Sequence, residues 1–354
     1  RMAWLAQAFN PCRMGRATFA EEGRALRMTQ PNPVSPSALP TAAGTDVHVV
    51  VVTYNGEAWI RGCLESLAQS STPVRSIVVD NASTDRTADI VEQEFPGTRL
   101  IRSTKNLGFG GGNNLGIVQA LADGARYVFL LNQDAYVLPT SVSELRDFME
   151  CHPEFGVASP LHCSPDADHL DPRTFRGYLQ AHAEGYLADA CFGRVQPYYV
   201  TFGVNAAAWF IRASTLRIAG GFDPLFFMYG EDDDLLHRWR HHGVGFALLT
   251  QSRVVHLRQS PAAGRVGFWG DVVRRSRRLR STLLTQVKRP HFSTAHMVAV
   301  VLAEGLVAPL AQGLVRRSAR DYLASVWAFV QVMAQWATVV KHARLTAQRG
   351  QHFL

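Results

Sequence analysis

The sequence predicts an α/β protein with a doubly wound, mostly parallel sheet, followed by a helical appendage. First, short apolar runs alternate with segments of helical periodicity from Val47 onward, which is the rhythm of strands joined by right-handed helical crossovers. Second, the 354 residues are 47% hydrophobic and 18% charged, enough to bury a sizeable core. Third, the chain becomes basic and helical after residue 264. We expect a mobile leader over residues 1–45, an α/β domain over 46–264 and a basic, apolar helical appendage over 265–354.

The first half of the predicted sheet consists of four strands with helices between them. Each strand is a short run of β-branched, aromatic or aliphatic residues, as expected of strands buried on both faces. Each helix has apolar residues at helical spacing. Asp85 is expected to cap the second helix, which Pro96 and Gly97 end. The strands are predicted at Val47–Thr53, 76–79, 98–102 and 127–131, and the helices at 58–69, 85–95 and 114–122.

The pattern loosens beyond the fourth strand. Ser141–Cys151 predicts a helix, and residues 157–230 predict short strands and loops with an aromatic-rich stretch. Residues 232–242 predict a further helix, which Gly243 ends, and a strand is expected at 244–249. The second half of the domain is therefore less defined by its sequence than the first.

The net charge of +7 is unevenly distributed. From Arg265 to the end, 14 Lys and Arg residues stand against three acids, a net of +11, which leaves a net of −4 on residues 1–264. This asymmetry points to an anionic surface, either nucleic acid or membrane lipid, as a partner of the C-terminal part.

The five cysteines are odd in number and contain no CxxC pair. The simplest interpretation is a reduced, cytosolic chain, because neither a zinc site nor a disulfide framework is indicated. Residues 1–26 contain no continuous apolar core followed by a cleavage site, so no signal peptide is predicted.

Polar side chains follow three of the predicted strands. Thr53 and Asn55 stand at the end of the first strand, Asp80 ends the second, and Asn132 and Asp134 follow the fourth. In open α/β sheets ligands bind beyond the carboxyl ends of strands, so these side chains are expected at one edge, where Asp134 would meet a metal or phosphate. Taken alone, the segment from Asn132 to Asp134 is more typical of a simple turn than of a binding site.

A glycine-rich cluster occupies residues 105–114. It begins like the dinucleotide fingerprint GxGxxG, but Asn113 stands where the third glycine belongs. A loop that cradles a phosphate is one interpretation, because glycines let backbone N–H groups approach closely. An ordinary glycine-rich turn is the other.

Four successive acids, residues 231–234, follow an aromatic run. Acids in the first turn of a helix are stabilised by its dipole, which is the structural interpretation. A functional interpretation requires only one of them, as a general base whose pKa is set by its neighbours. His256 lies 24 residues after Asp232, at the end of a predicted apolar run. It is either a structural residue or a metal ligand.

Together these segments resemble the family 2 glycosyltransferases with a GT-A fold, with the rhamnosyltransferase-like branch as the nearest match. The resemblance covers residues 47 to about 262, and its motifs occur in a consistent order. The motifs lie at residues 49–56, 78–87, 106–114, 131–135, 220–238 and 256–260.

The resemblance implies a site for a nucleotide-sugar donor. Thr53, Asn55 and Asp80 would hold the nucleotide, with Asp80 on the base. Asn106 and Asn114, in the motif at 106–114, would complete the nucleotide-sugar site.

The resemblance also implies a metal and a base. Asp134 would match the second acid of the family's DxD motif and bind Mg²⁺ or Mn²⁺, with His256 completing the metal and diphosphate site. Asp232 would match the base that removes the proton of the acceptor hydroxyl, while Asp234 would be a structural acid of the first turn. The departure is Asn132, where the general motif has Asp; an amide binds a hard cation less well than a carboxylate, so Asn132 either weakens the metal site or contacts the ribose.

The tail combines a basic block at residues 274–280 and 288–289 with apolar helical stretches at 296–314 and 322–340. Burying Glu304 in a bilayer would be costly, so a helix lying on an anionic membrane surface is one interpretation. An amphipathic helical hairpin packed on the α/β domain is the other. Nucleic-acid binding is disfavoured, because no recognised nucleic-acid-binding module accompanies the arginines.

The sequence thus predicts an inverting glycosyltransferase at the cytosolic face of the membrane. The resemblance implies transfer of a deoxyhexose, rhamnose from dTDP-rhamnose, to a glycan or polyprenyl-linked acceptor. A UDP- or GDP-sugar donor is the alternative within the class, and an inactive nucleotide-sugar-binding scaffold is the alternative outside it. A dinucleotide oxidoreductase is disfavoured, because the fingerprint is incomplete and does not follow the first strand.

Overall fold

The structure is a computed structural model that describes residues 45–183, 185–258, 267–309 and 318–354. The predicted leader, apart from residue 45, and the predicted boundary at residue 264 lie outside these ranges.

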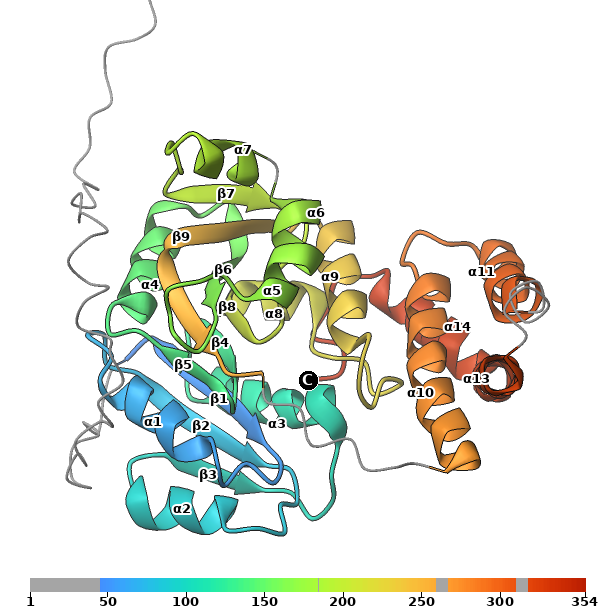
Figure 1. Cartoon of the computed structure of the whole chain (residues 1–354), viewed down its shortest axis with the longest axis horizontal. Coiled ribbons are helices and arrows are strands. Elements are labelled where there is room, and N and C mark those ends of the chain that lie inside the picture. Colours follow the sequence, from blue (N-terminus) through green and yellow to red (C-terminus); the bar gives the residue numbers. More distant parts are fainter. Residues whose placement is uncertain (1–44, 184, 259–266, 310–317) are drawn as a thin grey trace, which may run out of the picture.

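One half of the central sheet is parallel, as the sequence predicts (Figure 1). The order is β3-β2-β1-β4, and the buried strands β1, β2 and β4 pair along continuous apolar runs. Thr53 lies in register with Asp80, and Val52 with Asn132, so the three predicted polar ends share one edge of the sheet. The strands are β1 Val47–Thr53, β2 Arg75–Asp80, β3 Arg99–Arg102 and β4 Tyr127–Asn132.

The other half of the sheet is mixed, and the sequence gives little sign of it. Beyond β4 the order continues as β8-β6-β9-β5, with β7 paired to β9; β8 runs antiparallel to both β4 and β6. The strand predicted at 244–249 continues to His256, because after an irregularity it resumes pairing with β6 and also pairs with β5. The strands are β5 Ala135–Val137, β6 Phe155–Cys163, β7 Tyr198–Thr201, β8 Ala208–Arg212 and β9 Gly245–His256.

Helices cover both faces of this sheet. The side chains of α1, α2 and α4 form one apolar core with alternate residues of β1 and β4, and those of α3, α8 and α9 form a second core on the opposite face. The helices are α1 Ile60–Ala68, α2 Thr87–Glu94, α3 Gly108–Ala122, α4 Ser141–Cys151, α8 Ala213–Ala219 and α9 Glu231–His241.

The glycine-rich cluster is largely helical and is not the loop that the sequence suggested. Helix α3 begins at Gly108, six residues before the predicted start at Asn114. A Cβ atom on Gly112 would lie 2.6 Å from Val52 Cγ1, and one on Gly116 would clash with Val50. These glycines therefore let α3 lie directly against β1.

A small helical layer covers the outer part of the mixed sheet. It packs its own apolar cluster against β6, β7 and β9. Its elements are α5 Pro172–Thr174, the π-helical turn η2 Phe175–Leu179, α6 Gln180–His182 and α7 Tyr186–Cys191.

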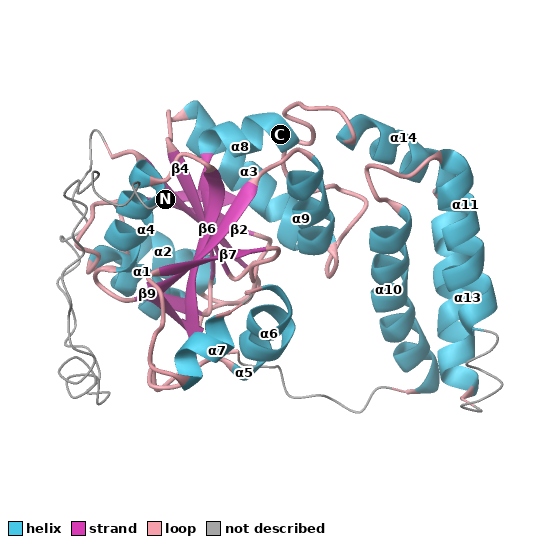
Figure 2. Cartoon of the chain, turned by 90° about the horizontal axis from the view of Figure 1, so that it is seen from above, coloured by secondary structure: helices cyan, strands magenta, loops and turns pink. Residues whose placement is uncertain are grey.

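The tail forms a separate group of helices beside α9 (Figures 1 and 2). Both predicted apolar stretches contain helices, except that residues 310–314 lie outside the described ranges. Within the described ranges, none of the helices taken singly has the length and apolar character to cross a membrane; α13 and α14 meet those criteria as a pair, bent by 68°. The elements are α10 Phe268–Val287, α11 Thr294–Leu302, η3 Ala303–Val307, α13 Ala319–Ala334 and α14 Trp336–Thr346.

A buried ionic cluster joins the tail to the α/β domain. Lys288 Nζ lies 2.6 Å from both Asp223 Oδ2 and Asp234 Oδ1, and all three side chains are 1% exposed or less. Arg238 Nε donates to Asp234 Oδ2 at 3.0 Å, and His342 Nδ1 lies 2.8 Å from Asp223 Oδ1. The tail is thus packed on the α/β domain, whereas the membrane interpretation concerns the exposed side of the same helices.

Candidate active site

The loop after β1 is fastened to the end of β4. Thr53 is fully buried, and its hydroxyl donates to Gln133 Oε1 at 2.5 Å. The same oxygen accepts from Tyr54 N at 3.0 Å. Gln133, which the sequence did not single out, therefore holds the start of the loop that carries Asn55 against the end of β4.

Asn55 connects this loop to the loop after β2. Its backbone has a positive φ of 48°, and its Oδ1 accepts from Thr84 N at 2.8 Å. Asp80 Oδ1 accepts from Ser83 N at 3.3 Å, whereas Asp80 Oδ2 has no hydrogen bond to the described residues. The two loops form a continuous rim along the sheet edge, and a carboxylate oxygen of Asp80 remains available there.

The asparagines of the 106–114 motif already have partners within the protein. Asn106 Oδ1 accepts from Asn81 Nδ2 at 3.1 Å and from Gly108 N at 2.9 Å. Asn114 exchanges two hydrogen bonds with the backbone of Phe222, both 2.8 Å long. Both side chains therefore hold other parts of the protein in place. Asn81 is buried and contacts Asn106, and the sequence did not single it out.

Asn132 is the last residue of β4, and Asp134 lies in the turn that leads into β5. The side-chain amide of Asn132 has no hydrogen bond within the described ranges, so it is free to contact a ligand. Because Ala135 pairs with His256 across β5 and β9, Asp134 Oδ1 comes 3.3 Å from His256 Nε2. The structure thus brings together two residues that are 122 positions apart in the sequence.

This pair fits a divalent cation whose remaining ligands come from a substrate. No group of three or more His, Cys, Asp and Glu side chains in the described part of the chain has metal-site geometry. A carboxylate oxygen and an imidazole nitrogen are present, and Mg²⁺ sites are commonly completed by water and substrate phosphate oxygens. The Asp134 side chain is 20% exposed, which leaves it open to such a complex.

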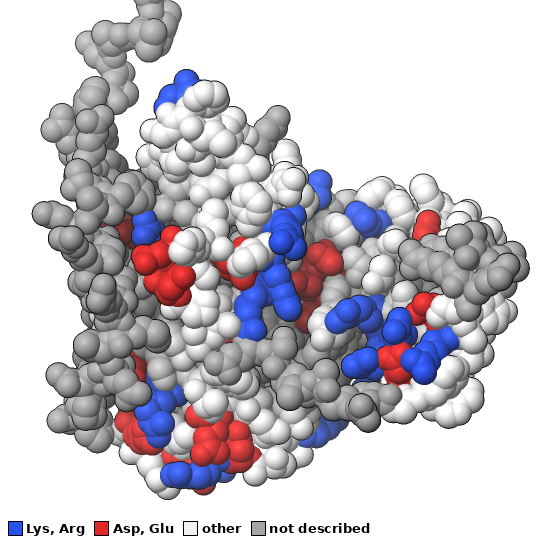
Figure 3. Space-filling model, in the orientation of Figure 1, with Lys and Arg blue, Asp and Glu red and all other residues white. Residues whose placement is uncertain are grey.

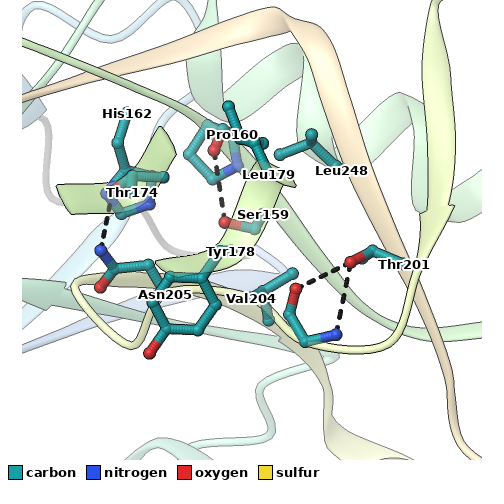
Figure 4. Close-up of a pocket in the computed structure, with 11 residues that line it drawn as sticks. Ser159, Pro160, His162, Thr174, Tyr178, Leu179, Thr201, Val204, Asn205 and Leu248 are labelled. Carbon is teal, nitrogen blue, oxygen red and sulfur yellow. Dashed lines mark hydrogen bonds between the residues drawn. The ribbon is translucent and has the colours of Figure 1, made fainter. Parts of the chain in front are cut away.

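His162 is a further buried histidine behind this pair. Its ring centroid lies 6.1 Å from that of His256, and neither ring nitrogen has a hydrogen-bond partner in the described residues. Burial lowers the pKa of His162 to about 3, with His256 contributing, so the ring is neutral. A cavity of about 10 Å³ borders it, with Thr174, Tyr178 and Asn205 around the opening (Figure 4), which is far too small for a sugar.

The four acids form the first turn of α9, after Gly230 in the left-handed conformation at φ 82°. Asp234 is buried and paired with Lys288 and Arg238, so it is the structural acid that the resemblance implied. Asp232 is partly buried, and its Oδ1 accepts from Asp233 N at 3.0 Å. Burial and the nearby Asp233 charge raise the pKa of Asp232 to about 6. Asp232 is therefore an unpaired carboxylate at neutral pH with the basicity of a general base.

A pocket of about 600 Å³ opens between the start of α9 and one face of α10. Figure 3 shows acidic atoms over α9 with basic atoms on both sides, one group of them over α10. Charges from both regions act on Tyr178: burial and the charges of Asp232 and Asp233 raise its pKa, whereas Arg258 lowers it. Arg258 follows closely after His256 at the end of β9.

The strand-end residues and an unpaired carboxylate beside a pocket are arranged as the resemblance to a GT-A type transferase implies. A model of Glycosyl transferase family 2 matches residues 48–213. This match over residues 48–213 confirms the resemblance and the enzyme class.

Similar proteins agree with this assignment. The N-acetylglucosaminyl-diphospho-decaprenol L-rhamnosyltransferase of Mycobacterium tuberculosis is 29% identical over 238 residues, which cover 60% of this chain and 76% of that protein. Galactofuranosyltransferase GlfT1 of the same species is 28% identical over 220 residues, covering 59% and 69%. The crystal structure of S. aureus TarS 1–349 in complex with UDP-GlcNAc has the same fold, with a TM-score of 0.53 and 16% identity over 86% of this chain and 88% of that one.

Proposed function

We propose that the protein is an inverting glycosyltransferase that moves a sugar from a nucleoside diphosphate to a hydroxyl group of a saccharide acceptor. The observation that carries the proposal is Asp232, an unpaired carboxylate with a pKa of about 6 in the wall of a pocket. A base with this pKa is ionised at neutral pH and still accepts a proton in the transition state.

The donor nucleotide is proposed to lie along the rim after β1 and β2. Thr53 and Asn55 shape the rim, and the free oxygen of Asp80 accepts from an N–H group of the base. Asn132, whose amide is unpaired in the described structure, contacts the ribose or diphosphate. Asn106 and Asn114 support the site by holding Gly108 and Phe222 in place.

Asp134 and His256 are proposed to hold Mg²⁺ or Mn²⁺ against the donor diphosphate. The bound cation supplies positive charge that stabilises the leaving group. Asp232 takes the proton of the acceptor hydroxyl while the oxygen of that hydroxyl forms a bond to the anomeric carbon. The bond from that carbon to the diphosphate oxygen breaks, its electron pair leaves with the diphosphate, and attack from the opposite face inverts the configuration.

The proposed donor is dTDP-rhamnose and the proposed acceptor is a glycan or a polyprenyl-linked saccharide. The mycobacterial relative is an N-acetylglucosaminyl-diphospho-decaprenol L-rhamnosyltransferase, which supports rhamnose as the sugar and a polyprenyl-linked saccharide as the acceptor. Galactofuranosyltransferase GlfT1, at a similar identity, keeps a sugar other than rhamnose in competition. The UDP-GlcNAc complex of TarS keeps a UDP-sugar as the competing donor, and a GDP-sugar is the further alternative. A scaffold without activity would have no need of the unpaired Asp232.

The tail is proposed to rest on an anionic membrane surface at the cytosolic face, where a polyprenyl-linked acceptor resides. Exposed apolar residues support this proposal. They lie on α11, η3 and α13 and include Leu302, Val307, Trp327 and Val330, which are 43%, 62%, 49% and 46% exposed. Apolar side chains of this kind bury into the headgroup boundary, while arginines meet the lipid charge.

The test is release of nucleoside diphosphate from a panel of dTDP-, UDP- and GDP-sugars with Mg²⁺ or Mn²⁺ and acceptor. Asp232→Asn keeps the shape of the side chain and removes the base, so we expect a loss of about 10²- to 10⁴-fold in turnover. Asp147→Asn, an exposed carboxylate on α4 outside the pocket, is the matched control. Turnover by Asp232→Asn equal to that of the control would exclude Asp232 as the base, and an absence of turnover with every donor would exclude the transferase.

A further inference from the structure

One face of α10 lines the pocket opposite the acids of α9, and this face is polar. Its residues recur at helical spacing, so they point in one direction. Leu283, Leu284 and Val287, by contrast, are buried in the core of the tail. The pocket-lining residues of this segment are Arg278, Ser281, Thr282, Thr285, Gln286 and, just past the helix end, Arg289.

The two arginines of this face form no ion pair, although the nearby Asp233 charge acts on Arg289. The guanidinium groups of Arg278 and Arg289 make neither an ion pair nor a hydrogen bond with any described residue. Arg278 lies over the Tyr229 ring, 4.9 Å from its centroid, which orients it at the pocket mouth. Arg289 is partly buried, and burial together with Arg240 lowers its pKa. By contrast, Arg274 and Arg275 on the same helix both pair with Asp271.

The opposite wall contains an unused polar group. Glu231 is 5% exposed and lines the pocket, and its Oε2 has no hydrogen-bond partner in the described residues. Burial and the Asp232 charge raise the pKa of Glu231 to about 8, so at neutral pH it is mostly protonated and is a hydrogen-bond donor. The pocket thus offers two unpaired cations and a neutral donor close to one carboxylate base.

We infer that this pocket binds the acceptor through a phosphate or diphosphate ester attached to the acceptor sugar, held by Arg278 and Arg289 while a sugar hydroxyl faces Asp232. The inference rests on the proposed function. Arginines bind phosphate through paired N–H groups, and the anion balances their positive charge. The hydroxyl groups of Ser281, Thr282 and Thr285 donate within the protein, so their oxygens remain free to accept from the sugar.

The test is binding, measured by isothermal titration without a donor so that it does not depend on turnover. The probes are farnesyl-diphospho-GlcNAc, GlcNAc 1-phosphate, methyl GlcNAc and inorganic pyrophosphate. We expect the two phosphorylated sugars to bind and methyl GlcNAc to bind at least about tenfold more weakly. Loss of each arginine should lower the affinity for the phosphorylated sugars roughly tenfold. Tight binding of farnesyl-diphospho-GlcNAc but not of GlcNAc 1-phosphate assigns the site to a lipid-linked diphosphate, and equal binding assigns it to the phosphate ester in general.

The variants are Arg278→Gln, Arg289→Gln and the double variant, with Arg217→Gln as the matched control. Arg217 is exposed on α8 and does not line the pocket. Unchanged binding of farnesyl-diphospho-GlcNAc by the double variant would overturn the inference. A loss of dTDP and UDP binding in the double variant, with farnesyl-diphospho-GlcNAc binding intact, would also overturn it, because the arginines would then belong to the donor. If binding is lost as expected while no nucleotide sugar turns over, the acceptor site stands and the proposed function fails.

Discussion

Lys288 is the residue on which the attachment of the tail depends, and its replacement by Met tests this. Its ammonium group lies 2.6 Å from carboxylate oxygens of both Asp223 and Asp234 and is inaccessible to solvent. Met fills a similar volume but leaves the two buried carboxylates with one cationic partner fewer. Removing one member of a buried ion pair costs about 3–5 kcal/mol. For a domain of this size that corresponds to a fall in Tm of about 6–20 °C.

The assay is thermal unfolding followed by circular dichroism, with Lys341→Met as the control. Lys341 is exposed on α14 and has no ion pair with a described residue. Adding Asp223→Asn to Lys288→Met removes one of the stranded charges, so the double variant should recover part of the loss. A fall in Tm of less than about 2 °C for Lys288→Met would refute the role of this cluster.

The same cluster predicts a dependence of stability on pH. Burial opposes the ionised form of Asp223, but the His342 hydrogen bond and the Lys288 charge outweigh it and hold the pKa of Asp223 below its ordinary 3.8. A depressed carboxylate pKa stabilises the folded state above the unfolded pKa. This contribution is therefore complete above about pH 4 and disappears as the pH falls further.

Three further predictions concern activity and localisation. Because the pKa of Asp232 is about 6, kcat/KM should fall about tenfold per pH unit below 6 and level off above it; a profile flat from pH 5 to 7 would contradict the base assignment. Asp134→Asn should raise the Mn²⁺ concentration for half-maximal activity at least about tenfold, and unchanged Mn²⁺ titration in the presence of dTDP would contradict the metal site. Replacing Val307 and Trp327 together by Ser should reduce sedimentation with phosphatidylglycerol vesicles without changing turnover of a water-soluble acceptor; equal sedimentation would contradict the membrane surface.

The parallel half of the sheet could be predicted because each of its strands is indicated by its own run of apolar residues. The run Val47–Thr53 needs no distant partner to indicate a buried strand, and its bounds are confirmed. The register of Thr53 with Asp80 follows from parallel pairing, so their shared edge could also be predicted. The assignment of Asp234 as structural followed from its place in a helical first turn.

The remainder depends on contacts between distant segments. Strand β5 has three residues, too few for a periodic signal, yet its pairing with β9 brings Asp134 to His256. The start of α3 was wrong because its glycines suggest a turn in the sequence, while in the fold they permit contact with β1. Arg278 and Arg289 were interpreted as part of a basic block. Their position opposite α9 depends on how the tail packs, which the neighbouring residues in the sequence do not indicate.

The proposed acceptor pocket and the proposed donor site lie in different parts of the chain. The family 2 match ends at residue 213, whereas both walls of the pocket, α9 and α10, lie after it. If the proposed acceptor site is correct, substitutions in α10 alter it without changing Thr53, Asp80 or Asp134. Exchanging α10 between related transferases should then change the acceptor preference and leave the donor unchanged, provided that Lys288, directly after the helix, is kept.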